Sequence, residues 1–137
     1  MISKKNGLSK FERLHSRKQL DAVFANGKSF RHGPLKLIYL EVPFENTPAP
    51  SSFVFTVSKR QFKRAHDRNY IKRLLREVYR VNKHALNEHL LKEGKAMHGC
   101  FIFLGLKKPN YLSLNKNMVN ILAQLIPSEN EVDQSTN

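Results

Sequence analysis

The spacing of apolar residues changes twice between residues 53 and 106, and this change restricts the chain to few folds. Residues 53–59, FVFTVSK, alternate with a period of two, which predicts a strand with one aromatic face and one mixed face. From about residue 65 to 90 the apolar residues follow the 3.6-residue spacing of a helix. The near-continuous apolar run HGCFIFLGL, residues 98–106, is typical of a strand buried on both faces, often beside a parallel neighbour. The three segments together predict a βαβ unit.

Another helix is predicted upstream, in the segment SRKQLDAVFANG at residues 16–27. Three of its residues, at i, i+3 and i+4, share one face: Leu20, Val23 and Phe24. Gln19 has the spacing of a capping box, and Gly27 is a suitable C-terminal stop. Across the chain, the candidate N-caps of the predicted helices are Ser16, Asp67 and Ser113.

The remaining segments complete one small domain. Residues 28–33 and 34–42 are expected to be extended, and a loop with three prolines follows at 43–52. A last amphipathic helix is expected at 112–126. The predicted order is α-β-β-β-α-β-α, an α+β fold. The domain limits that we expect are a single domain over 1–126, with an extended basic arm at 1–15 and a disordered tail at 127–137.

The charge balance points to a polyanionic partner. The chain has 24 Lys and Arg against 11 Asp and Glu, a formal net charge of +13, which favours nucleic acid over an anionic membrane. No apolar run approaches the ~20 residues that a membrane-spanning helix needs. The basic N-terminus lacks the apolar stretch of a secretory signal, and the single cysteine, Cys100, cannot form an internal disulfide. We therefore expect a cytoplasmic protein.

Cations and apolar residues are separated on the long helix. On a helical wheel one broad arc carries Arg68, Lys72, Arg73, Arg76, Arg80 and Lys83. The opposing arc carries Ile71, Leu74, Leu75, Val78, Ala85 and Leu86. Residues 59–83 hold ten Lys or Arg but only two acids, Asp67 and Glu77, both placed away from the cationic arc. A face that is merely solvated usually mixes the signs, whereas this separation favours phosphate binding.

The sequence contains no recognisable catalytic constellation. The acidic residues occur singly outside the tail, and the six histidines show no metal-ligand spacing. His66 beside Asp67 is the only suggestive histidine, and a surface or RNA-contacting role explains it more simply than catalysis. We assign no catalytic residue to the chain, and an autonomous metal-dependent nuclease is disfavoured.

The segment SKRQFKRAHDRNYIKRLLREVYR, residues 58–80, resembles the protein subunit of bacterial ribonuclease P. That family has a strand ending in Ser-Lys-Lys/Arg and then a helix with Arg-Asn-x-x-Lys-Arg-x-x-Arg-Glu. The matching residues are Ser58, Lys59, Arg60, Arg68, Asn69, Lys72, Arg73, Arg76 and Glu77. Upstream, the segment RLHSRKQLDAVFANGKSF resembles the family's first helix, with matches at Arg13, Phe24 and Gly27. The chain departs from the pattern at Tyr70, where the family usually has Arg, and at Leu20, where it usually has an aromatic residue.

The resemblance implies a sandwich with a small mixed sheet and a left-handed βαβ crossover, although such crossovers are right-handed in roughly 98% of proteins. It also implies that a catalytic RNA subunit, using bound Mg²⁺, removes the 5′ leader of precursor tRNA while the protein assists. The implied RNA-subunit contacts are Arg64, Arg68, Asn69, Tyr70, Lys72, Arg73 and Arg76. The implied contacts in the leader-binding cleft are Arg13, Leu20, Phe24, Phe55, Lys59 and Arg60. Phe55 has an ordinary core position as its alternative.

The partners implied by the resemblance are the RNA subunit and precursor tRNA, without DNA or membrane. One competing interpretation is a ribosomal-type or RNA-chaperone protein with no associated enzymatic activity. The basic composition fits that interpretation equally well, so composition alone does not separate the two.

Overall fold

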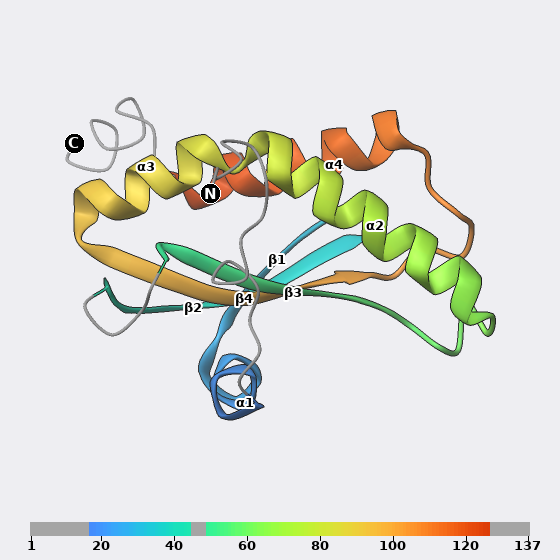
Figure 1. The fold of residues 1–137 in the computed structure, drawn as a ribbon, viewed down its shortest axis with the longest axis horizontal. Coiled ribbons are helices and arrows are strands. Elements are labelled where there is room, and N and C mark those ends of the chain that lie inside the picture. Colours follow the sequence, from blue (N-terminus) through green and yellow to red (C-terminus); the bar gives the residue numbers. More distant parts are fainter. Residues whose placement is uncertain (1–16, 45–48, 127–137) are drawn as a thin grey trace, which may run out of the picture.

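The computed structural model describes residues 17–44 and 49–126, which form four helices and a four-stranded sheet (Figure 1). The elements in chain order are α1 (Arg17–Asn26), β1 (Lys28–His32), β2 (Leu35–Pro43), β3 (Ser51–Val57), α2 (Ala65–Asn82), α3 (His84–Glu93), β4 (Lys95–Phe103) and α4 (Tyr111–Leu125). The α+β class is confirmed. The predicted basic arm, the predicted tail, Arg13 and the Ser16 cap lie outside the described residues.

The sheet has the strand order β1-β2-β4-β3. The inner position of β4 explains why residues 98–106 form a near-continuous apolar run. β4 pairs antiparallel with β2 and parallel with β3, so both edges of β4 are covered by neighbours. Side chains on both faces of β4 are buried from Ala96 to Phe101. The prediction of a doubly buried strand beside a parallel neighbour is therefore confirmed.

The connection from β3 to β4 passes through α2 and α3 on one face of the sheet. In Figure 1, β3 lies in front of β4 and both run from left to right, while α2 and α3 return above them. This path describes a left-handed crossover, as the resemblance implies and against the general preference.

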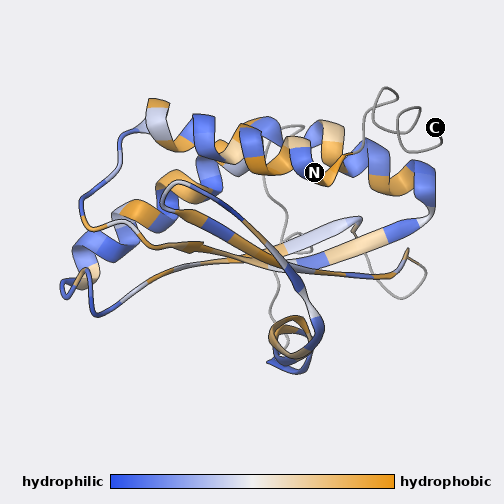
Figure 2. Cartoon of the chain, turned by 180° about the vertical axis from the view of Figure 1, so that it is seen from behind, coloured by the Kyte–Doolittle hydropathy of each residue, from blue (hydrophilic) through white to orange (hydrophobic). Residues whose placement is uncertain are grey.

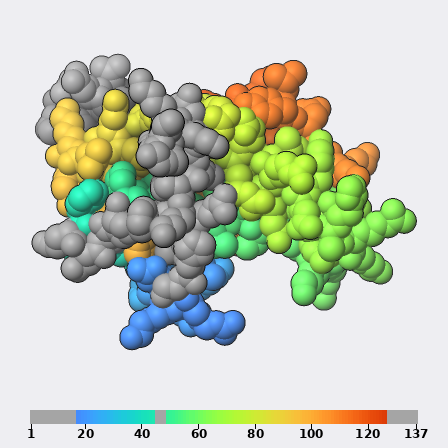
Figure 3. Space-filling view, in the orientation of Figure 1, coloured from blue at the N-terminus to red at the C-terminus, as the bar shows by residue number. Residues whose placement is uncertain are grey.

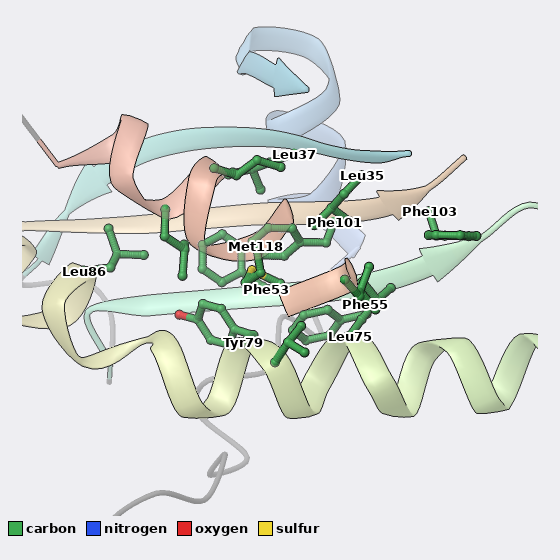
Figure 4. Close-up of a cluster of buried hydrophobic side chains, with 14 of the residues drawn as sticks. Leu35, Leu37, Phe53, Phe55, Leu75, Tyr79, Leu86, Phe101, Phe103 and Met118 are labelled. Carbon is green, nitrogen blue, oxygen red and sulfur yellow. The ribbon is translucent and has the colours of Figure 1, made fainter. Parts of the chain in front are cut away.

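The helices cover both faces of the sheet. α2, α3 and α4 lie on one face and α1 lies on the other (Figure 1). Figure 2 shows the helices as alternating bands of apolar and hydrophilic residues, as amphipathic helices have. The main core lies between the sheet and the three helices (Figure 4), and its residues include Leu35, Leu37, Phe53, Phe55, Phe101, Phe103, Ile71, Leu75, Tyr79, Leu114, Met118 and Ile121.

The single helix expected from about 65 to 90 is two helices, α2 and α3, separated at Lys83. The Asn82 side-chain amide donates to the Val78 carbonyl at 2.7 Å, the acceptor that the backbone N–H of residue 82 uses in a regular helix. The same amide also donates to the Asn115 side chain of α4 at 2.7 Å. The helical wheel placed Lys83 on the cationic arc and Ala85 on the apolar arc. Both placements are wrong, because the helix breaks at Lys83, which is buried, and Ala85 is exposed.

Two of the proposed helix caps are also wrong. Asp67 lies in the first turn of α2, where Arg64 is the N-cap residue and makes no side-chain capping bond. Asn110, not Ser113, caps α4, because its side-chain oxygen accepts a hydrogen bond from the Ser113 backbone N–H at 2.9 Å. A cap must precede the first helical turn, whereas Asp67 and Ser113 both lie inside helices that begin at Ala65 and Tyr111.

The strands extend into the segment predicted as a loop at 43–52. β2 continues to Pro43, and β3 begins at Ser51 rather than at residue 53. Ser51 is buried, and its hydroxyl lies 2.6 Å from the Tyr79 hydroxyl and donates to the Asn87 side chain at 2.6 Å. These bonds satisfy the serine, so a polar residue can begin a buried strand.

Candidate nucleic-acid interface

α2 collects all seven residues that the resemblance assigns to the RNA subunit, counting Arg64 as its N-cap. Arg68, Lys72 and Arg76 recur every four residues and form one half-buried stripe along the helix. Asn69 and Arg73 form a second, exposed stripe beside it. Figure 3 shows α2 and the segment before it at the front right of the molecule. The structure therefore places six of the seven predicted residues on one side of the helix or at its N-cap, and Tyr70 lies on the other side, toward the loop between β4 and α4.

Arg68 has an internal role that the sequence pattern does not show. Its Nη1 donates to the backbone carbonyls of Phe62 and Lys63, at 2.7 and 2.8 Å. Phe62 is itself buried against Phe103, with ring centroids 6.1 Å apart. Arg68 thus holds the basic segment between β3 and α2 against the start of the helix.

The two acids of α2 are both neutralised. Asp67 binds Lys108 of the β4–α4 loop at 2.7 Å, and this contact lowers the pKa of the Asp67 carboxyl. Glu77 pairs with Arg80, and their hydrogen bond lowers the pKa of Glu77. Arg80 had been assigned to the cationic arc, so the expectation that both acids stand apart from that arc is correct for Asp67 and wrong for Glu77.

The leader-binding residues expected on α1 differ in exposure. Val23 is fully buried against the sheet, whereas the adjacent ring of Phe24 is 52% exposed and Leu20 is half-buried. Gly27 ends the helix where a Cβ atom would lie 2.4 Å from the Val23 carbonyl oxygen and 2.8 Å from that of Tyr39. Glycine is therefore needed for this close approach, and Phe24 is available to a ligand.

The structure contradicts the assignment of Phe55 to the cleft. Its ring points to the face of the sheet that α2 covers, is only 6% exposed, and stacks on Phe101 with centroids 5.6 Å apart and planes 5° apart (Figure 4). α1 lies on the opposite face. Phe55 is a core residue, the alternative noted from the sequence.

The face that α1 shares carries residues that the sequence analysis missed. The strand register aligns a row across all four strands: Arg31, Lys36, Ile102 and Thr56. Arg31 is exposed and the other three are half-buried. Lys59 and Arg60, which the resemblance already implies as cleft residues, are exposed just after β3. The sequence feature that could have identified Thr56 is the mixed face of residues 53–59. Successive side chains of a strand point to opposite faces, so Thr56 must point away from the face that Phe55 occupies.

In residues 17–44 and 49–126, no three His, Cys, Asp or Glu side chains are placed to hold a metal ion. His66 is exposed, as a surface role requires. His98 is buried, which lowers its pKa, and burial raises the pKa of Cys100 to about 11. The thiol is therefore unreactive at neutral pH.

The described helices include none that is both long and apolar enough to cross a membrane.

The sequence of the chain is similar to those of known proteins. The sequence profile of the family described as Ribonuclease P matches residues 8–125. The ribonuclease P protein component of Porphyromonas gingivalis is 37% identical over 119 residues, which cover 87% of this chain and 86% of the relative. That of Chlorobaculum tepidum is 39% identical over 103 residues, covering 72% and 67%.

Solved structures share the fold. The Staphylococcus aureus RNase P protein aligns with a TM-score of 0.64 and 19% identity, over 83% of this chain and 94% of that one. The RNase P protein from Thermotoga maritima aligns with a TM-score of 0.65 and 20% identity, over 82% and 96%. The chain is thus a member of the ribonuclease P protein family.

Proposed function

We propose that this chain assists a catalytic RNA subunit in removing the 5′ leader of precursor tRNA. Family membership makes it the protein component of an endoribonuclease with an RNA partner. The single observation that carries the assignment of surfaces is the separation of cations on α2 from the exposed Phe24 on the other face of the sheet. Two surfaces of different chemistry suit two different RNA ligands.

The cationic side of α2 suits the folded RNA subunit. Arg68, Lys72, Arg73 and Arg76 lie within about two and a half turns of α2. Arginine can bind a phosphate through two parallel hydrogen bonds. Closely spaced like charges cost stability in the free protein, and phosphates would relieve that repulsion. In this proposal Asn69 adds a hydrogen-bonding amide to the same surface.

The α1 face of the sheet suits the single-stranded leader. Phe24 offers an exposed ring on which a base can stack, a contact worth about 1–3 kcal/mol in single-strand sites. Lys36 and Thr56 lie in the row across the sheet, and Lys59 and Arg60 follow at its end. Cations, a hydroxyl and an exposed aromatic ring on one face of the sheet are groups that can bind the phosphates and bases of a flexible strand. Leu20 would add apolar contact beside Phe24.

The proposal assigns Mg²⁺ to phosphates of the RNA subunit and its substrate. The protein then contributes binding and orientation, and charge neutralisation lets the RNAs approach at lower Mg²⁺ concentrations. None of the described side chains is given a proton-transfer or nucleophilic role.

One cleavage assay tests the function. Precursor tRNA is incubated with the protein alone, with ribonuclease P RNA alone at low Mg²⁺, and with both. Cleavage is expected from the RNA and a marked increase from the two together. If the protein never increases cleavage by the RNA, it is a binding protein of another kind. If the protein cleaves alone, catalysis belongs to the chain itself.

A further inference from the structure

The β4–α4 loop meets the start of α2 at a three-residue contact that the family pattern does not include. Lys108 Nζ lies 2.7 Å from Asp67 Oδ1 and 5.8 Å from the centroid of the Tyr70 ring. Asp67 and Tyr70 are three residues apart, so both lie on the side of α2 that faces this loop. The ammonium group of Lys108 is therefore held by an ion pair and by a cation–π contact at once.

The exposures of these side chains decide which charge a ligand meets. The Lys108 side chain is 51% exposed and that of Asp67 is 19% exposed. Tyr70 is 40% exposed. An approaching phosphate would reach the ammonium before the carboxylate, and an ammonium group has three hydrogen-bond donors, of which Asp67 uses one.

The β4–α4 loop and α4 contribute no acid that would repel a phosphate at this contact. From Leu104 to Ile126, the loop and α4 contain Lys107, Lys108 and Lys116 and no Asp or Glu. Lys107 is exposed next to the contact. Arg64, the N-cap residue of α2, lies close enough to Asp67 to help lower the pKa of that carboxyl, so the cations at the start of α2 reach the Lys108 contact although the stripes of Arg68 and Arg73 lie on the other side of the helix.

We propose that Lys108, fixed by Asp67 and Tyr70, binds a phosphate of the RNA subunit, which makes the β4–α4 loop a second element of the RNA-binding surface. This inference rests on the proposed function of α2. The Asp67 carboxylate keeps Lys108 ordered, because a side chain already fixed in the free protein loses less conformational entropy when it binds. The ring of Tyr70 offers a flat apolar surface beside the bound phosphate.

A double-mutant cycle tests this role. Binding of ribonuclease P RNA from Porphyromonas gingivalis is measured over a range of salt concentrations for the wild type, Lys108→Ala, Asp67→Asn and the double variant. Loss of one phosphate contact lowers the slope of log K against log salt by ~0.7–0.9. We expect this loss on Lys108→Ala both with and without Asp67. Lys92→Ala, an exposed lysine in the last turn of α3, is the matched control and should leave the slope unchanged.

The possible outcomes separate the alternatives. A loss that occurs only when Asp67 is present would mean that Lys108 merely neutralises that carboxylate, which contradicts the proposal. An unchanged slope in both backgrounds would contradict it as well. Arg73→Ala, measured in parallel, reports on α2: if it lowers the slope and Lys108→Ala does not, this inference alone fails. If neither changes the slope, the assignment of α2 fails too. Thermal unfolding of each variant checks that the fold is intact.

Discussion

At the scale of single residues, two phenylalanine side chains on opposite faces of the sheet have opposite roles that their residue type does not reveal. Phe24 is 52% exposed on α1, whereas Phe55 is 6% exposed and packed among rings in the core. The resemblance placed both in the leader-binding cleft. Only the direction of each side chain, which depends on strand alternation and on the side of the sheet where α1 packs, separates them.

Phe24→Ala should impair leader recognition without weakening the fold. The ring is exposed, so the free energy of unfolding should change by less than about 0.5 kcal/mol. Loss of base stacking should cost about 1–3 kcal/mol in binding of precursor tRNA to the holoenzyme, with little effect on mature tRNA. Leu91→Ala, an exposed residue on α3, is the control. Equal losses for both tRNAs would argue against the cleft.

Phe55→Ala should weaken the fold without impairing leader recognition. Removing a buried ring that contacts Phe101 and Tyr79 leaves a cavity, and the free energy of unfolding should fall by about 3–5 kcal/mol in urea titrations. Phe55→Leu should lose less. Where the variant remains folded, its preference for leader-bearing tRNA should match that of the wild type. A variant that is stable but does not discriminate between the tRNAs would show that our core assignment is wrong.

At the scale of elements, the basic helix α2 is shaped by contacts with other elements, which a helical wheel cannot show. The break at Lys83 depends on Asn82 reaching Asn115 of α4, and Asp67 is neutralised from the β4–α4 loop. α3 ends at Gly94, whose φ of 68° lies in the left-handed region that favours glycine. Hydrophobic periodicity locates a helix well, but side chains from other elements decide where it is interrupted.

Alanine substitutions of Arg68 and Arg73 should distinguish a residue that holds the segment before α2 in place from one that only contacts phosphate. Arg73→Ala should lower the salt slope of RNA binding by ~0.7–0.9 and leave the melting temperature unchanged, because Arg73 is exposed. Arg68→Ala should also lower stability, by about 1–2 kcal/mol, since Nη1 bonds two backbone carbonyls. Arg68→Lys keeps the charge and serves as the control: it should retain the slope but not all of the stability. An unchanged melting temperature for Arg68→Ala would exclude the positioning role.

At the scale of the whole molecule, stability should depend on pH through one buried imidazole. His98 is buried and its pKa lies below the ordinary value of 6.5 because burial disfavours the charged form. The unfolded chain therefore binds a proton that the folded chain does not, and stability falls as pH decreases below the unfolded value. The pKa values of Asp67 and Glu77 are lowered, so their contributions are lost only at more acidic pH.

Urea unfolding between about pH 7.5 and 5.5 measures this effect. The wild type should lose stability toward the acidic end of that range, and His98→Gln should show a flatter dependence. The comparison is between pH dependences, so a uniform loss of stability in the variant does not affect it. If His98→Gln retained the wild-type dependence, another group would be responsible.

The sequence by itself determined the α+β class, the βαβ unit and the position of the basic helix. These follow from local periodicity and charge, which depend only on residues close together in the chain: Ile71, Leu75 and Val78 are buried as their spacing predicts. The motif around Arg68 and Asn69 then indicated the family.

Tertiary structure alone decided which side of the sheet each residue faces and which distant groups meet. Phe55 was misplaced because α1 packs on the other face of the sheet, and Lys36 and Thr56 were missed because the row they share arises from pairing with β4. Lys108 lies 41 residues from Asp67 in the chain, yet the parallel pairing of β3 and β4 puts the segments that follow the two strands at the same end of the sheet, where the two side chains meet. Such contacts depend on register and packing, which no local pattern in the sequence specifies.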